Sequence, residues 1–100
     1  MRAIRELNSF KRDIRRVRRN PHHRDIAGLL AAVLRFLCSD ALMPERYKDH
    51  PLSGEWLGSR DCHLKFDLVL IYRKQEKDIL ELVRIGTTAS SSESDRAGLV

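Results

Sequence analysis

The apolar run LVLIY, residues 68–72, constrains the fold of this chain most. Five consecutive apolar residues with strong β propensity suit a strand that is covered on both faces, and such a strand needs neighbouring strands in a sheet. The flanking segments supply them. Ile79–Ile85 forms a last strand that ends at Gly86, and residues 61–66 alternate between polar and apolar positions. The polar side of that alternation holds Asp61, His63 and Lys65, and the apolar side holds Cys62, Leu64 and Phe66.

Two segments before the sheet have helical periodicity. The first carries an apolar stripe, and the second a broader apolar face that is wide enough to lie against a sheet. Asn8 or Ser9 can cap the first helix, and Asn20-Pro21 ends it. The second helix is expected to start near residues 22–25 and to end near residues 39–40. The apolar positions are Leu7, Phe10, Ile14 and Val17 in the first helix, and Ile26, Leu29, Leu30, Val33, Leu34 and Leu37 in the second.

The order of these elements predicts an α+β fold class, with two antiparallel N-terminal helices packed on an antiparallel β-sheet of four to five strands. Residues 1–7 read as a short first strand or an extended lead-in, and residues 41–53 read as a loop. A chain of 100 residues fits one domain, which we assign to residues 1–88. Residues 89–100 form a Ser-rich tail with too little apolar surface to pack, so we expect it to be disordered.

Composition narrows the class of protein. No run of about 18 apolar residues is present, so we expect no membrane span, and the N-terminus lacks the apolar core of a signal peptide. We therefore expect a cytoplasmic protein with no membrane partner. Cys38 and Cys62 fit that compartment as reduced, buried thiols, and no ligand spacing accompanies them that would indicate a metal.

The net charge of +5 is concentrated at the N-terminus. Residues 1–24 hold nine of the 19 basic residues and only two acidic ones. A basic block on a small domain indicates contact with a polyanion or with an acidic protein partner, and the alternative is a solvated helix face.

The residues best suited to chemistry lie between Tyr47 and Asp67, where two of the four histidines occur among carboxylates and cations. Imidazole exchanges protons near neutral pH, so His50 and His63 are candidates for acid–base work on a phosphate. Arginines such as Arg60 and Arg84 suit a phosphate whose charge grows during cleavage. The alternative is that both histidines are structural. The pair His22-His23 reads as a surface feature, and no glycine-rich phosphate loop, dinucleotide fingerprint or nucleophilic-serine motif is present.

The same segment resembles the YafQ branch of the RelE-like (RelE/ParE) superfamily, the small toxins of bacterial type II toxin–antitoxin systems. The likeness covers about 85 residues, is densest over residues 44–73, and rests on both spacing and order. The residues that carry it are Tyr47-Lys48-Asp49-His50-Pro51-Leu52, Gly54, Trp56, Gly58, Arg60-Asp61, His63, Asp67, Ile71-Tyr72, Arg84 and Gly86-Thr87.

The resemblance implies a compact microbial-ribonuclease-like fold and an endoribonuclease that cuts messenger RNA on the ribosome. It implies a cognate antitoxin and the ribosome with bound mRNA as partners, and DNA contact only through the antitoxin complex. No cofactor and no metal are expected, because attack by the 2′-hydroxyl of RNA needs only proton carriers and cations.

Carried over by position, the resemblance makes His50, His63 and Asp67 active-site residues, with Asp61 beside them. We assign general base or substrate positioning to His50, and proton donation or phosphate binding to His63. Asp67 would orient a histidine or polarise the hydroxyl, and Arg84 would stabilise charge. The expected contacts to RNA or the ribosome are Lys48, Arg60, Lys65, Arg15, Arg16 and Arg19.

One position departs from the family pattern. The family places a principal acid–base histidine directly after Gly-Thr, and this chain has Thr88 there, followed by alanine and serines. Three explanations stay open. The toxin is weakened or silent, or His63 or His50 has taken over the acid role, or mutation or a shifted reading frame has altered the end of the chain.

Two rival functions follow from the same residues. A RelE-fold protein with a weakened or inactive site binds an antitoxin or the ribosome without cleavage. A basic nucleic-acid-binding module instead uses the first helix and predicts affinity for naked RNA that falls steeply with salt. The apolar second helix disfavours this module, because a helix-turn-helix reader needs polar residues on its second helix.

Overall fold

The structure, a computed structural model, describes residues 1–65, 67–75 and 78–87 of the chain. The predicted tail, residues 89–100, and the predicted strand position Phe66 lie outside the described residues. The two main helices are α1 (Asn8–Arg19) and α2 (Ile26–Cys38). The strands are β1 (Ala3–Glu6), β2 (His50–Pro51), β3 (Arg60–Lys65), β4 (Leu68–Gln75) and β5 (Ile79–Thr87), and three short 3-10 helices are η1 (Pro21–His23), η2 (Glu45–Tyr47) and η3 (Gly54–Trp56).

The five strands form one sheet in the order β1-β5-β4-β3-β2. The run LVLIY lies in its central strand, β4, and all five of these residues are buried, as the sequence predicts. The sheet is mixed, because β1 pairs in parallel with β5 while the other neighbours are antiparallel. The prediction of a wholly antiparallel sheet was wrong on this point. β1 is followed by α1 and is not joined to β5 by a hairpin, so the connection does not require the two strands to run antiparallel.

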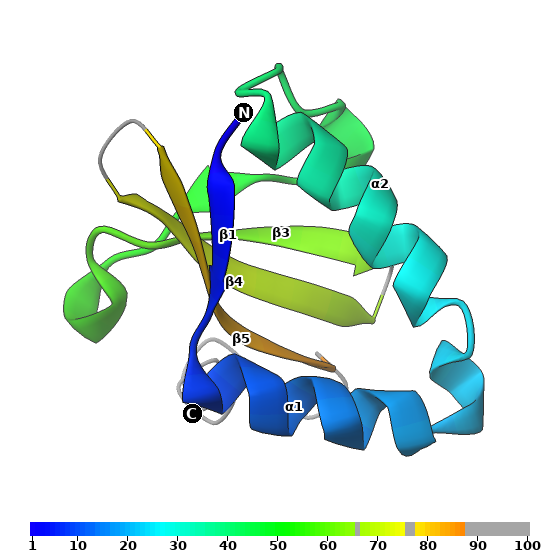
Figure 1. The fold of residues 1–100 in the computed structure, drawn as a ribbon. Helices are drawn as coiled ribbons and strands as arrows, with labels where there is room; N and C mark the ends of the chain where they lie inside the picture. Colours follow the sequence, from blue (N-terminus) through cyan, green and yellow to red (C-terminus); the bar gives the residue numbers. More distant parts are fainter. Residues whose placement is uncertain (66, 76–77, 88–100) are drawn as a thin grey trace.

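Both helices cover the same face of the sheet (Figure 1). The stripe Phe10, Ile14 and Val17 of α1 packs along β5, and α2 crosses the sheet over β3 with Ile26, Val33 and Leu37 buried. The chain turns through η1 between them, and α2 leaves α1 at an inclination, so the two helices are not strictly antiparallel (Figure 1). Together they define the α+β fold that the sequence predicts.

The start of α1 differs from the predicted cap. Leu7 occupies the cap position with an extended backbone, and no side chain caps the helix. Ser9 instead donates its hydroxyl to the carbonyl oxygen of Val83 at 2.6 Å. That bond satisfies a polar group of β5 beyond the point where β1 stops pairing, so Ser9 stabilises the sheet edge rather than the helix end.

The turn between the helices corrects a second expectation. Asn20 accepts the backbone N–H of His22 and so caps η1. His22 is exposed as predicted, but His23 is 1% exposed and belongs to the packed turn, so the prediction of two surface histidines was wrong for His23.

The loop between α2 and β3 brings a short edge strand to the sheet. Residues 50 and 51 pair with residues 61 and 60 of β3, and the N–H of Leu52 donates to Ser59 at 2.9 Å. Gly54 and Gly58 have positive φ angles of 68° and 94°, a conformation that favours glycine, so this loop depends on both. Among the described residues, no helix is long and apolar enough to cross a membrane.

Candidate active site

His50 and Asp61 meet where β2 joins the sheet. They are cross-strand partners, and Nδ1 of His50 lies 3.0 Å from Oδ1 of Asp61 and 2.9 Å from the carbonyl oxygen of Lys48. A carbonyl oxygen and a carboxylate only accept hydrogen bonds, so Nδ1 must carry the proton. The neutral ring therefore has its lone pair on Nε2, which is the nitrogen left available to a substrate.

The two partners differ sharply in exposure. The side chain of His50 is 46% exposed, whereas that of Asp61 is fully buried. The sequence placed Asp61 on the polar side of its strand, where exposure is expected, and that expectation was wrong because the side chain has no exposed surface. The structure thus has an accessible imidazole in front of a buried carboxylate, an arrangement that fixes the ring tautomer and orientation.

His63 lies on the same face of the sheet as this pair. It follows Asp61 by two residues along β3, so the two side chains project on the same side. His50 and His63 are diagonal neighbours on adjacent strands, a relation that places two residues of a sheet about 7–8 Å apart, with their Cβ atoms somewhat closer.

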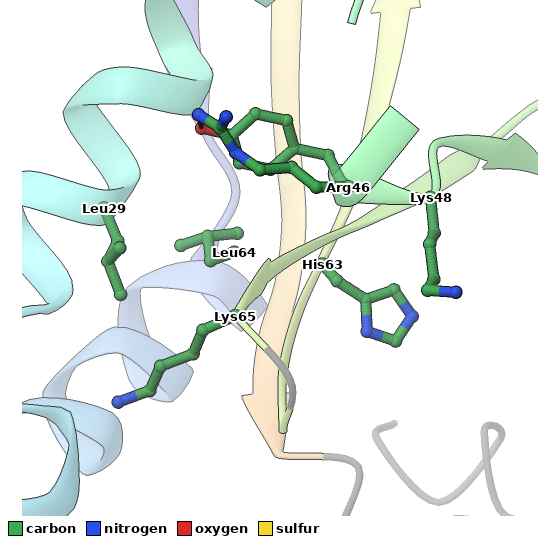
Figure 2. Close-up of a pocket in the computed structure, with 7 residues that line it drawn as sticks. Leu29, Arg46, Lys48, His63, Leu64 and Lys65 are labelled. Carbon is green, nitrogen blue, oxygen red and sulfur yellow. Dashed lines mark hydrogen bonds between the residues drawn. The ribbon is translucent and has the colours of Figure 1, made fainter. Parts of the chain in front are cut away.

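His63 also lines a hollow of about 490 Å³ beside the edge of β3 (Figure 2). His63 and Lys48 extend on one side of β3, while Leu64 and Leu29 of α2 form an apolar wall on the other (Figure 2). The full lining is Leu29, Arg46, Tyr47, Lys48, His63, Leu64 and Lys65, so every ionisable side chain in it except the tyrosine is basic or an imidazole. An apolar floor with a cationic rim suits a ligand that joins a flat ring to a phosphate.

Two further predicted site residues, Asp67 and Arg84, lie outside β2 and β3. Asp67 is in the turn next to Leu68, the first residue of β4, which pairs with Lys65. Arg84 gives two donors to Asp13 of α1, with Nε to Oδ2 at 2.5 Å and the terminal nitrogen to Oδ1 at 3.0 Å. The structure therefore brings together His50, Asp61 and His63, and it holds Arg84 in a mainly buried ion pair.

The predicted cationic contacts fall into two groups. Arg60 is bidentate to Asp49, and Lys65 donates to Asp25 and to the carbonyl oxygen of His22. The Lys65 ammonium holds the pKa of Asp25 below its usual value. The others are exposed on the surface: Lys48, Arg15, Arg16 and Arg19.

Three residues around the site were not among the predicted site residues. Arg46 stacks on the ring of Tyr47, with its guanidinium carbon 4.8 Å from the ring centre, and lines the hollow. Tyr72 and Asp49 form a short hydrogen bond behind His50. A usable signal was present for Asp49, because a residue next to His50 in an extended segment must point to the opposite face.

Cys62 lies between Asp61 and His63 but points into the core. Burial, with a smaller contribution from the charge of Asp49, raises the pKa of the Cys62 thiol to about 12. It therefore stays protonated and is no candidate nucleophile. Thr88 lies outside the described residues, and within them no group of three or more histidine, cysteine, aspartate or glutamate side chains could hold a metal ion.

These features define a small α+β protein whose sheet carries an imidazole–carboxylate site beside a cationic hollow. A model of the family described as bacterial toxin of type II toxin-antitoxin system, YafQ, matches residues 2–90. The mRNA interferase toxin YafQ of Escherichia coli strain K12 is 33% identical over 89 residues, which cover 89% of this chain and 94% of that protein. The chain belongs to the YafQ family of type II toxins.

Solved structures agree in fold. The crystal structure of YafQ from E. coli BL21(DE3) has a TM-score of 0.76 and 33% identity, covering 90% of this chain and 97% of that one. The YafQ chain of the E. coli DinJ-YafQ complex has a TM-score of 0.75 and 32% identity, with the same coverage of 90% and 97%. The structural likeness spans nearly the whole of each chain, so the site lies inside the shared fold.

Proposed function

We propose that this chain is an mRNA interferase, an endoribonuclease that cleaves messenger RNA on the ribosome by attack of a ribose 2′-hydroxyl on the adjacent phosphate. The similarity to the mRNA interferase toxin YafQ of E. coli supports the activity. The observation that carries the chemistry is the ring of His50, whose Nδ1 faces two acceptors while Nε2 remains available.

In this proposal His50 is the general base. Its Nε2 takes the proton of the 2′-hydroxyl, the 2′-oxygen bonds to phosphorus, and the bond from phosphorus to the 5′-oxygen breaks. The buried carboxylate of Asp61 stabilises the imidazolium that forms. His63, on the same face, is proposed to give a proton to the leaving 5′-oxygen.

The hollow beside His63 is proposed to hold the nucleotide next to the cut, with Lys48 and Arg46 near its phosphate. Arg15, Arg16 and Arg19 on the exposed side of α1 are proposed contacts to ribosomal RNA. The roles of Asp67 and Arg84 stay predictions. For Arg84 the negative charge of Asp13 offsets the positive charge of the guanidinium, so its contribution to the transition state is expected to be smaller than that of an unpaired arginine.

The partner proposed for this chain is a cognate antitoxin, since the structural relative was solved in a complex of DinJ with YafQ. A message on the ribosome as substrate implies action in the cytoplasm. DNA contact is proposed only through the antitoxin complex.

The test is cleavage of a defined message on purified ribosomes, read by primer extension. His50→Gln should lower kcat about 10²–10⁴-fold, because it removes one acid–base group. His22→Gln removes an exposed imidazole in η1 and is the matched control, which should cleave at the parent rate. Cleavage by His50→Gln at the parent rate would exclude His50 as the base.

The alternative, a toxin fold that binds an antitoxin or the ribosome without cutting, rests on Thr88 in place of the family's histidine. The same assay separates the two. Intact message with the parent chain, restored cleavage with Thr88→His, and tight antitoxin binding by both would favour the alternative.

A further inference from the structure

The strand that carries His50 is too short to hold a catalytic side chain by itself. β2 has two residues at the sheet edge, and the second, Pro51, has no N–H to donate. Lys48, two residues before β2, has a left-handed backbone, with φ 49° and ψ 42°, which a residue with a side chain adopts only at a cost. Something besides strand pairing must therefore fix this segment.

Asp49 supplies that hold. Its Oδ1 accepts a short hydrogen bond from the hydroxyl of Tyr72, and Arg60 donates from Nε and a terminal nitrogen at 3.3 and 3.1 Å. Tyr72 is 1% exposed in the central strand, and Arg60 is its cross-strand partner. We call these three side chains the Asp49 anchor, which ties the segment before β2 to the two strands beyond it.

The anchor and the candidate catalytic pair lie on opposite faces of the sheet. Tyr72 belongs to the core beneath the helices, whereas Asp61 follows Arg60 by one residue and so points to the other face. His50 follows Asp49 by one residue and meets Asp61 there. Because Asp49 and His50 are joined by a single peptide unit, the position of Asp49 on one face of the sheet constrains the position of the His50 ring on the other face.

The protons of the anchor are fixed at neutral pH. Burial, and then the hydrogen bond to Asp49, raise the pKa of Tyr72, so its hydroxyl remains a donor. The hydrogen bonds that Arg60 donates to the Asp49 carboxylate likewise raise the pKa of Arg60. The network therefore keeps one arrangement of donors, in which Tyr72 and Arg60 both donate to Asp49.

We propose that Asp49, held by Tyr72 and Arg60, is a positioning residue that keeps the His50 ring against Asp61 in the Nδ1–H tautomer, so that Nε2 faces the substrate. The kinetic part of this inference rests on the proposed function. The tautomer of His50 does not, because it is a property of the free protein.

The first test uses Tyr72→Phe, which removes only the hydroxyl, and Asp49→Asn, which removes the carboxylate. Long-range ¹H–¹⁵N spectra of the histidine-labelled protein, above the pH at which the rings titrate, report which nitrogen of His50 carries the proton. The parent should show protonated Nδ1, and both variants should show a mixture of the two tautomers. Asp40→Asn is the matched control, since Asp40 is also a carboxylate held by two cations, Arg2 and Lys74, and it should keep the parent spectrum of His50.

The second readout is kinetic. In the ribosome assay both variants should lose about tenfold to a hundredfold in kcat, with KM within about twofold, because the base is misplaced while the RNA contacts remain. Parent-like tautomer and kcat in both variants would reduce the anchor to a purely structural role. Should Tyr72→Phe fail to fold by circular dichroism, Asp49→Asn decides alone, because its side chain is partly exposed.

The two proposals fail in different ways. Full cleavage by His50→Gln overturns the catalytic role of His50 and leaves the tautomer result standing. An unchanged tautomer in the variants overturns the anchor even when His50→Gln is inactive.

Discussion

Two bidentate arginine–carboxylate pairs lie on opposite sides of the central strand β4, one on β5 and one on β3, and they differ in how far their side chains are exposed. Asp13 and Arg84 join α1 to β5, with side chains 3% and 12% exposed. Asp49 and Arg60 join the loop before β2 to β3, with side chains 19% and 41% exposed. The first pair is separated by 71 residues in sequence and the second by 11.

The buried pair does more than join two charges. Asp13 also accepts the backbone N–H of Ile85 at 3.1 Å, on the stretch of β5 that lies beyond its pairing with β1. Loss of the carboxylate would leave both the N–H and the guanidinium without their acceptor in a dry environment. The pair of Asp49 and Arg60 is partly exposed and is screened by water, so its contribution to stability is smaller and its effect is on the position of a neighbour.

The largest effect on stability is therefore expected at Asp13. Asp13→Asn should lower the free energy of unfolding by about 3–5 kcal/mol, because it breaks a buried pair and leaves a charge behind. Asp49→Asn should cost about 1 kcal/mol or less. Urea unfolding followed by circular dichroism measures both, and equal losses in the two variants would show that exposure does not separate the pairs.

A double variant sharpens this result. Replacing both partners by apolar residues, Asp13→Leu with Arg84→Met, removes the unpaired charge and should recover most of the loss seen for either single change. The orphaned N–H of Ile85 should prevent full recovery.

The sequence predicted the class of fold because its signals are local. Five buried residues in a row mark the central strand, and the stripe of α1 matches its packing. The parallel pairing of β1 was not predicted, since it depends on where α1 returns the chain and not on any pattern in residues 3–6. In the same way, Asp13 reads as one of two acids in a basic block, and only the packing of α1 on β5 shows that it is buried.

The sequence predicted which residues belong to the candidate site better than it predicted which of them contact one another. The alternation in β3 places Asp61 and His63 on one face, as expected, and the short β2 puts His50 beside them. Asp61 contacts His50, because the two-residue pairing of β2 sets the register. The role of Asp67, to orient a histidine or to polarise the hydroxyl, stays a prediction. No pattern in one chain shows which neighbour Asp49 turns to, so the Asp49 anchor could not be predicted.

A smaller difference between the two pairs is expected in how their coupling energies depend on salt. In 1 M NaCl the Debye length falls to about 3 Å, so the coupling energy of Asp49 with Arg60, about 0.5 kcal/mol at low salt, should fall by about half or more. The coupling of Asp13 with Arg84 should change little. Double-mutant cycles at low and high salt measure both, and an equal loss for the two pairs would contradict the role of burial.

The smallest expected effect is a change in pH dependence at Glu81, which tests whether the exposure of the carboxylate or of the cation governs a pair. The carboxylate of Glu81 is 8% exposed, close to Asp13, while its partners Arg5 and Arg73 are 58% and 36% exposed, like Arg60. Burial alone raises the pKa of Glu81, but the hydrogen bonds and charges of Gln75, Arg73 and Arg5 outweigh it and hold the pKa below 4.5.

A carboxylate whose pKa is lowered by folding stabilises the folded state at any pH above its pKa in the unfolded chain. That contribution is lost as the pH falls through the pKa in the folded state. The free energy of unfolding should therefore drop between pH 5.5 and pH 3 more steeply in the parent than in Glu81→Gln. If the two curves of unfolding free energy against pH are parallel, the exposed arginines do not stabilise the buried Glu81 carboxylate. The exposure of the cation would then be what separates the Asp13–Arg84 pair from the Asp49–Arg60 pair.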